Sequence, residues 1–269
     1  MFYEGSEKRL EITSTLNLLD FEHGFWQEMV KQAGAYIISH IKNDQLKAFI
    51  LSESSLFIWK NKLLLITCGE THLLQAALYF QRHVARDQIK SLLFQRHQAN
   101  KPAQQKSSFE QDRLQLHQHL NGNSLHWHED YQGDLFIFGN NKNAFSTKNI
   151  VMFHDLSGPF FDELQYGKIT STQVTRRLQL SDYFNDFLIA DHRFEPKGYS
   201  VNAISESDYL TLHITPELQS SYLSFESNLD TDLILLFITK ISAILNPQRA
   251  YLMKFKTIDN LLNIDIKTI

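Results

Sequence analysis

The sequence predicts an α+β protein in which helices pack against antiparallel strands. Short apolar runs recur along the chain and are separated by short polar turns, as in a β-meander. Stretches with apolar residues at helical spacing interrupt these runs in both halves of the chain. The aromatic content, with 20 Phe and 10 Tyr, favours a large core based on sheets.

Composition narrows the class of protein. Of the 269 residues, 43% are hydrophobic and 21% are charged, as in an ordinary soluble globular protein. The formal net charge of -4 argues against a nucleic-acid partner. No apolar run reaches the length of a membrane-spanning helix and no secretory signal is visible, so no membrane partner is expected. A single cysteine excludes an internal disulfide and is compatible with a reducing cytoplasm, the location that we expect.

The first half of the chain is predicted to start as an antiparallel meander. Expected strands cover residues 8–12, 36–41, 46–52, 57–59, 62–67 and 89–94. A short helix is expected at 25–31, and an amphipathic helix at 71–85 with Thr71 as its N-cap. A third helix is expected at 109–120, because Ser107 and Glu110 have the spacing of a capping box.

The second half repeats the alternation of strands and helices. Expected strands cover residues 125–129, 134–139, 150–153, 187–191, 199–204, 209–215, 222–225 and, as the last strand, 251–256. Helices are expected at 159–164, at 171–178, and from an N-cap at Asp230 or Thr231 through Leu245. Because no low-complexity linker is present, we expect a single domain of residues 1–269 with halves of about 1–122 and 123–269.

One polar stretch interrupts the strand pattern. Ser52-Glu53-Ser54-Ser55 lies inside the apolar run from Ala48 to Ile58, and such local inconsistency is expected at functional sites. A serine hydroxyl can attack an adjacent peptide carbonyl when the turn is strained and proton-transfer groups are near. The only cysteine, Cys68, follows Ser54 by fourteen residues.

Three segments, in the same order, resemble eukaryotic-type S-adenosylmethionine decarboxylases. The central one is Leu51-Ser52-Glu53-Ser54-Ser55-Leu56-Phe57 followed by Thr67-Cys68-Gly69. An N-terminal element is Tyr3-Glu4-Gly5-Ser6-Glu7-Lys8. A C-terminal block combines Gly198-Tyr199-Ser200, His213-Ile214-Thr215-Pro216-Glu217 and Ser224-Phe225-Glu226-Ser227-Asn228. The resemblance implies a four-layer α/β/β/α sandwich with two central antiparallel sheets, built from two similar halves.

The resemblance also implies a self-made cofactor. The Ser54 hydroxyl would attack the Glu53 carbonyl, and cleavage between residues 53 and 54 would leave a covalent pyruvoyl group at position 54. This group would bind the substrate amine as a Schiff base and accept the electrons released on decarboxylation. Ser200 and His213 would assist processing, and Cys68 would protonate the product. The cleaved N-terminal fragment, residues 1–53, would stay bound to residues 54–269.

Without these motifs, each catalytic candidate would be interpreted as structural. His213 would be a hydrogen-bonded strand histidine, and Cys68 a small buried hydrophobic residue. The resemblance further assigns five residues to binding of S-adenosylmethionine. The rings of Tyr3 and Phe194 would stack on the adenine, the Glu217 carboxylate would hold the ribose hydroxyls, and the backbones of Leu51 and Glu53 would meet the adenine edge. Glu4 and Glu7 would lie beside the site and are counted with the catalytic residues.

The chain departs from the family at several positions. Ile66 replaces a lysine common before the cysteine. Two acidic residues of a buried charge network that binds putrescine in some relatives align near Phe145 and Asn149, whereas Glu11 and Glu226 remain. Stimulation by putrescine is therefore doubtful.

The sequence also offers one candidate metal site. His117, His119, His126 and His128 lie close in sequence, but their spacing favours a solvated polar edge and no metal is expected. The interpretation adopted is decarboxylation of S-adenosylmethionine, which supplies the aminopropyl donor for spermidine synthesis. The alternatives are a pyruvoyl-dependent decarboxylase of ornithine or arginine and a non-catalytic regulatory partner. The sequence is silent on oligomeric state, and a homodimer is one option.

Overall fold

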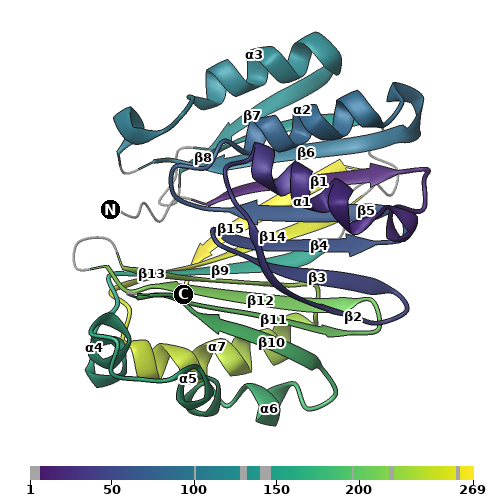
Figure 1. The fold of residues 1–269 in the computed structure, drawn as a ribbon. Helices are drawn as coiled ribbons and strands as arrows, with labels where there is room; N and C mark the ends of the chain where they lie inside the picture. Colours follow the sequence, from purple (N-terminus) through teal and green to yellow (C-terminus); the bar gives the residue numbers. More distant parts are fainter. Residues whose placement is uncertain are drawn as a thin grey trace. The chain divides into compact units, whose positions relative to one another are not determined.

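The fold consists of two units, Met1–Ala144 and Phe145–Ile269. A computed structural model of the chain describes residues 7–99, 101–127, 132–139, 147–195, 197–217, 221–258 and 261–269. Each unit is built on one antiparallel sheet, and its helices lie along that sheet (Figure 1). The predicted α+β class with two antiparallel sheets is confirmed.

The first unit has eight described strands in the order β2-β3-β4-β5-β1-β6-β8-β7. Their bounds are β1 Lys8–Ser14, β2 Ile37–Lys42, β3 Leu46–Leu51, β4 Ser54–Trp59, β5 Lys62–Thr67, β6 Ile89–His97, β7 Gly122–Trp127 and β8 Gly133–Gly139. Its helices are α1 His23–Gln32, α2 Leu73–His83 and α3 Phe109–His119, with short 3-10 turns at Leu18–Asp20, Arg86–Gln88 and Pro102–Gln104.

The second unit has seven described strands in the order β10-β11-β12-β13-β9-β14-β15. Their bounds are β9 Lys148–His154, β10 Leu188–Arg193, β11 Tyr199–Ser205, β12 Asp208–Thr215, β13 Tyr222–Ser227, β14 Arg249–Ile258 and β15 Leu261–Thr268. Its helices are α4 Pro159–Gln165, α5 Ser171–Arg177, α6 Leu180–Tyr183 and α7 Thr231–Leu245.

The strand order shows that the units are two copies of one plan. The first strand of each unit, β1 or β9, is inserted between the fifth and sixth strands, after a meander of four. The boundary between units falls after Ala144, whereas the sequence placed it near residue 122. The difference arises because β7 and β8 extend the first sheet beside β6.

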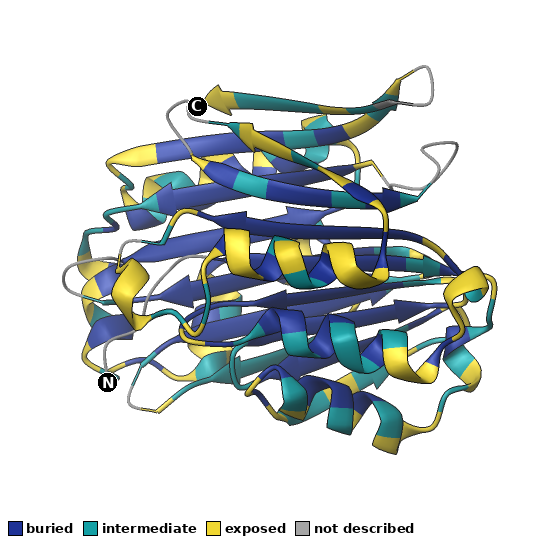
Figure 2. Ribbon diagram, turned by 90° about the horizontal axis from the view of Figure 1, so that it is seen from above, coloured by how far each residue is buried: buried dark blue, intermediate teal, exposed yellow. Residues whose placement is uncertain are grey.

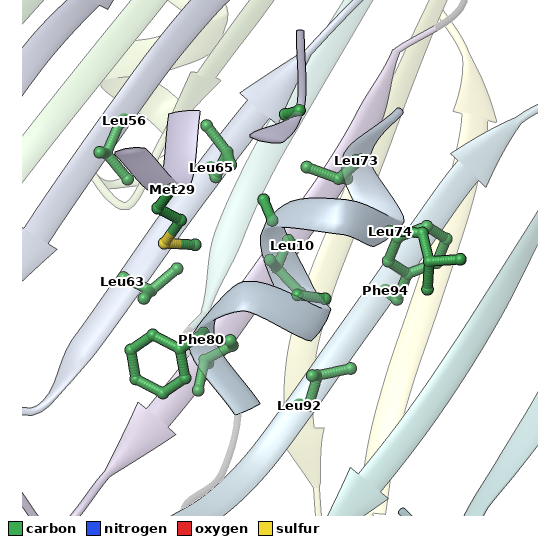
Figure 3. Close-up of a cluster of buried hydrophobic side chains, with 14 of the residues drawn as sticks. Leu10, Met29, Leu56, Leu63, Leu65, Leu73, Leu74, Phe80, Leu92 and Phe94 are labelled. Carbon is green, nitrogen blue, oxygen red and sulfur yellow. The ribbon is translucent and has the colours of Figure 1, made fainter. Parts of the chain in front are cut away.

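Strands and helices differ in how their residues are buried. Most strand residues are buried, while helices alternate between buried and exposed positions, as expected for helices that cover a sheet (Figure 2). In β1, Leu10 joins an apolar cluster with Met29 of α1 and Leu74 of α2 (Figure 3). Ile12 belongs to the same cluster. Arg9 and Glu11 alternate with them and so lie on the opposite face of the strand, yet both are buried.

Three local predictions were wrong. Helix α2 begins at Leu73 with His72 as N-cap, because the Thr71 hydroxyl donates to the Cys68 carbonyl instead (2.9 Å). The capping box at α3 uses Ser108 and Gln111, one residue later than expected, since the glutamine amide serves as well as a glutamate. Finally, β14 is followed by β15, which pairs along its length, so residues 251–256 are not the last strand.

The apolar cluster of the first unit supports a stability prediction. Leu10 is fully buried among side chains of β5, β6 and α2, so Leu10→Ala should lower the free energy of unfolding by about 2–5 kcal/mol. As a control, Leu114→Ala on α3, at a position 51% exposed, should change it by less than about 0.5 kcal/mol. Urea denaturation followed by circular dichroism measures both, and equal midpoints would contradict the role given to Leu10.

Candidate active site

The polar stretch noted in the sequence forms a tight hairpin. Leu51 at the end of β3 pairs with Ser54 at the start of β4, so Ser52 and Glu53 are the two turn residues. The Ser52 amide donates to the Tyr36 carbonyl (2.9 Å), and the Tyr36 amide donates to the Ser52 hydroxyl (3.1 Å). The interruption of the apolar pattern is therefore a turn that is fixed to the chain before β2.

Ser54 has a strained backbone. Its φ is +122°, a value that a residue with a β-carbon rarely adopts, and its side chain is buried. Such a conformation costs about 1–3 kcal/mol and persists only where the surroundings impose it. Here β3 and β5 flank the residue, which pairs with both Leu51 and Thr67. The strained torsion is thus the one directly after the peptide bond that joins Glu53 to Ser54.

Two donors converge on the carbonyl oxygen of that bond. The Cys68 amide donates to the Glu53 oxygen at 3.2 Å, and the Cys68 Sγ lies 3.3 Å from the same oxygen. Cys68 is fully buried. Donors aimed at a carbonyl oxygen in a site that excludes water stabilise the negative charge that develops when a nucleophile attacks the carbon.

The turn that carries Cys68 is fixed from several sides. The Lys8 Nζ donates to the Gly69 carbonyl (2.9 Å) and to the Thr71 carbonyl (2.6 Å). The Gln105 Nε2 donates to the same Gly69 oxygen at 3.2 Å, and Gly69 itself has φ of +62°. Lys8 ends the N-terminal motif but was given no role from the sequence, and Gln105 was not predicted at all.

The Glu53 side chain is also perturbed. Burial raises the pKa of its carboxyl to about 7, while the nearby charge of Lys8 opposes the shift and that of Glu70 adds to it. One carboxyl oxygen lies 4.0 Å from the Cys68 Sγ. Near neutral pH this group is therefore partly protonated beside the thiol.

The second unit holds a buried serine–histidine pair. Ser200 on β11 and His213 on β12 are register partners, and the Ser200 Oγ is hydrogen-bonded to the His213 Nδ1. Burial lowers the pKa of His213 to about 4. The imidazole is consequently neutral at physiological pH and able to accept a proton.

Next to this pair lies an aromatic ring on a turn. The Phe194 and His213 rings have centroids 6.1 Å apart, and the Phe194 amide donates to the Gly198 carbonyl (2.9 Å). Lys197 belongs to this turn, and its Nζ lies 2.9 Å from a carboxyl oxygen of Glu217. The structure thus brings Phe194, Ser200 and His213 together in one unit, with Glu217 in an ion pair.

The predicted residues of the N-terminal element are only partly described. Tyr3 and Glu4 lie outside the described residues. Glu7 is fully buried and forms an ion pair with Arg9, whose Nη1 lies 2.9 Å from the His97 Nε2. Arg9 was not predicted, because a cation within an otherwise ordinary strand gives no signal in a single sequence.

The residues of the predicted charge network are buried as well. Glu226 accepts a hydrogen bond from the Tyr209 hydroxyl (2.7 Å). Asn149 donates to the Leu229 carbonyl (3.2 Å) and accepts from the Thr231 hydroxyl (3.2 Å). Phe145 lies outside the described residues. Asn149 therefore serves to anchor the start of α7.

The described histidines of the predicted cluster have separate partners. His117 packs against the Phe136 ring, whereas His126 is hydrogen-bonded to Asp134 (2.6 Å). His128 lies outside the described residues. In the part of the chain that the structure describes, no group of three or more His, Cys, Asp or Glu side chains is placed to hold a metal ion. Nor does any helix there have the length and apolarity to cross a membrane.

Fold and site together define a two-sheet α+β protein in which a strained serine follows a polarised carbonyl, an arrangement suited to transfer of the acyl group from nitrogen to oxygen. Residues 1–264 match the family model described as adenosylmethionine decarboxylase. The chain belongs to this family.

Similar proteins agree with this assignment. An S-adenosylmethionine decarboxylase proenzyme of Xenopus laevis is 30% identical, over 92% of this chain and 81% of that protein. The proenzyme of Dictyostelium discoideum is 28% identical, over 84% of this chain and 67% of that protein. The crystal structure of the Trypanosoma brucei AdoMetDC-delta26 monomer matches with a TM-score of 0.57 and 22% identity, over 76% of this chain and 80% of that one. This likeness bears on the fold alone and agrees with the predicted fold class.

The strain at Ser54 can be tested with two substitutions. Ser54→Gly and Ser54→Ala both remove the hydroxyl, but only glycine accepts a φ of +122° without a steric penalty. After allowance for the greater flexibility of glycine in the unfolded chain, Ser54→Gly should be more stable than Ser54→Ala by about 1 kcal/mol. Denaturant midpoints of the two uncleaved variants measure this difference. An alanine variant as stable as the glycine variant would show that position 54 is not strained.

Proposed function

We propose that this chain is a self-processing, pyruvoyl-dependent decarboxylase of S-adenosylmethionine. The observation that carries the proposal is the Glu53 carbonyl, which faces the amide and thiol of Cys68 and precedes the strained Ser54. Membership of the adenosylmethionine decarboxylase family supplies the substrate. These residues fit a pyruvoyl group at position 54, because both the serine that would form it and the donors that would promote its formation are present.

Processing begins with attack of the Ser54 Oγ on the carbonyl carbon of Glu53. The carbon–nitrogen bond breaks and an ester forms, while Cys68 stabilises the charge on the carbonyl oxygen. His213, held by Ser200, is the proposed acceptor of the Ser54 Cα proton, and the Glu53 carboxylate leaves. The dehydroalanine that remains at residue 54 tautomerises to an imine, and hydrolysis of this imine by water releases ammonia and would leave the pyruvoyl carbonyl.

Cleavage would leave the first unit intact. The fragment 1–53 contains β1, β2 and β3, and β1 lies inside the sheet between β5 and β6. Hydrogen bonds on both edges of β1 therefore hold the N-terminal fragment to residues 54–269. This fragment is the proposed permanent partner of the larger one.

When formed, the pyruvoyl group supplies a carbonyl that binds the substrate amine and accepts electrons as carbon dioxide leaves. The chain's own residues supply the other functions. We assign the Cys68 thiol the donation of a proton to the substrate Cα, and the adjacent Glu53 carboxyl can return a proton to that thiol. Glu7 acts indirectly, because its carboxylate is already paired with Arg9.

Recognition of the substrate is assigned to aromatic rings, carboxylates and backbone groups. Phe194 presents a ring suited to stacking on adenine and to attracting the sulfonium cation. Glu217 offers a carboxylate to the ribose hydroxyls, and the Leu51 and Glu53 backbones offer hydrogen bonds to the adenine edge. Tyr3 is the proposed second stacking ring, and Glu4 an acidic neighbour.

Release of carbon dioxide tests the activity. Purified wild-type protein should release labelled carbon dioxide from carboxyl-labelled S-adenosylmethionine, and Ser54→Ala should release none above background. Release from ornithine or arginine but not from S-adenosylmethionine would overturn the proposed substrate. An active Ser54→Ala variant would overturn the proposed cofactor.

The low pKa of His213 predicts the pH dependence of processing. The neutral imidazole is the base, so it is lost as the pH falls through the folded-state pKa of about 4, not through the usual value of about 6.5. At pH 5 about nine-tenths of the imidazole should still be neutral, and self-cleavage should stay within about twofold of its rate at pH 7.5. Gel electrophoresis of freshly synthesised precursor after a pH jump measures this rate.

A variant and a fold control complete this experiment. His213→Ala should slow processing by at least about a hundredfold at every pH, while circular dichroism verifies that the wild type stays folded at pH 5. A half-loss of wild-type rate near pH 6.5 would contradict the neutral, buried imidazole.

A further inference from the structure

The substrate-binding carboxylate assigned to Glu217 has a partner that no motif predicts. Glu217 follows β12 by two residues, and Lys197 precedes β11 by two residues. Because these strands are antiparallel neighbours with Tyr199 opposite Ile214, both side chains come to the same end of the sheet. There the Lys197 Nζ lies 2.9 Å from the Glu217 Oε2.

This ion pair is partly protected from solvent. The Lys197 side chain is 25% exposed and the Glu217 side chain 20% exposed, so screening is weaker than for a pair fully in water. Among the described residues, no second group hydrogen-bonds to the Glu217 carboxylate. One carboxyl oxygen is thus held by the lysine, and Oε1 stays available to a ligand.

The same lysine belongs to the turn that presents Phe194. The Phe194 amide is bonded to the Gly198 carbonyl (2.9 Å), and Gly198 adopts φ of +119°. A β-carbon at Gly198 would lie 3.4 Å from the Phe194 side chain, so the turn is closely packed against the ring. The ion pair therefore ties the carboxylate to the turn that positions the aromatic ring.

We propose that Lys197 is a specificity-determining positioning residue, which orients Glu217 so that its free oxygen accepts hydrogen bonds from the vicinal hydroxyls of a nucleoside sugar. This inference rests on the proposed function and deepens it. Lys197 touches Glu217 and not the reacting atoms, so its effect is on the binding of the sugar.

The charge of the pair has a second consequence. An isolated carboxylate would attract any cation, including a free basic amino acid. Pairing with Lys197 cancels most of this charge, so the carboxylate discriminates by hydrogen-bond geometry and not by net attraction. The site then favours a nucleoside with an intact sugar diol over ornithine or arginine.

The experiment measures binding of two neutral probes, 5′-methylthioadenosine and its 2′,3′-dideoxy analogue, by isothermal titration calorimetry. The wild type should prefer the diol by at least about tenfold. Lys197→Met should reduce this preference to less than about threefold, and Lys197→Arg should retain most of it. Lys240→Met, an exposed position on α7, serves as the matched control and should leave it unchanged.

Kinetics provide a second measurement. With S-adenosylmethionine, Lys197→Met should raise KM by about five- to twentyfold and change kcat by less than about threefold, because only the binding of the sugar is altered. In a Glu217→Gln background the lysine substitution should have little further effect, as expected for two residues that act as a unit.

Several results would overturn the inference. They are an unchanged diol preference in Lys197→Met, tighter binding of the diol by that variant, and a wild type without diol preference. Binding of the neutral probes needs no pyruvoyl group. A lysine-dependent diol preference in a protein that releases no carbon dioxide would therefore overturn the proposed catalysis while upholding the role of Lys197.

Discussion

The hydrogen bonds from Cys68 to the Glu53 carbonyl are the interaction on which the rest of the structure depends. An amide and a thiol from one residue meet the oxygen of the peptide bond that precedes a strained serine. Neither donor would be placed there by local structure alone, because β5 and the turn after it must first bring Cys68 back beside the hairpin. The pairing of β4 with β5 in the first sheet therefore places both donors of Cys68 beside the Glu53 carbonyl.

The buried polar residues of the first unit serve the same end. Lys8, at the start of β1, donates hydrogen bonds to two carbonyls of the Cys68 turn. Burying a lysine costs free energy unless its donors are satisfied, and here three oxygens of that turn satisfy them. The Lys8 ammonium has a second effect: its charge lowers the pKa of the Glu53 carboxyl and so opposes the increase caused by burial.

The second unit supplies a buried base, the imidazole of His213. His213 is buried on a strand and bonded to Ser200, and burial lowers the pKa of its imidazole. A neutral imidazole is the state needed of a base, and no carboxylate is required to set it. The two units share one strand order but carry their polar residues at different ends of equivalent strands: Ser54 lies beside the β3–β4 turn, whereas Ser200 and His213 lie at the end of β11 and β12 away from the turn that joins them.

Sequence alone predicted much of this arrangement, for identifiable reasons. Apolar periodicity revealed most strands and helices, since β-strands and amphipathic helices each impose a regular pattern. The serine cluster at 52–55 was visible because it broke such a pattern. Gln105 and Arg9 could not be found this way, because their roles depend on contacts with residues distant in sequence. The helix cap at Thr71 was misassigned for the same reason, since its hydroxyl is used by Cys68.

The intact mass of the purified wild-type chain tests most directly whether the Glu53 carbonyl is activated for attack by Ser54. Mass spectrometry under denaturing conditions should find two fragments that divide after Glu53. The larger one should be lighter, by one ammonia, than residues 54–269 with an N-terminal serine. A single uncleaved chain, or a larger fragment that still begins with serine, would contradict the account.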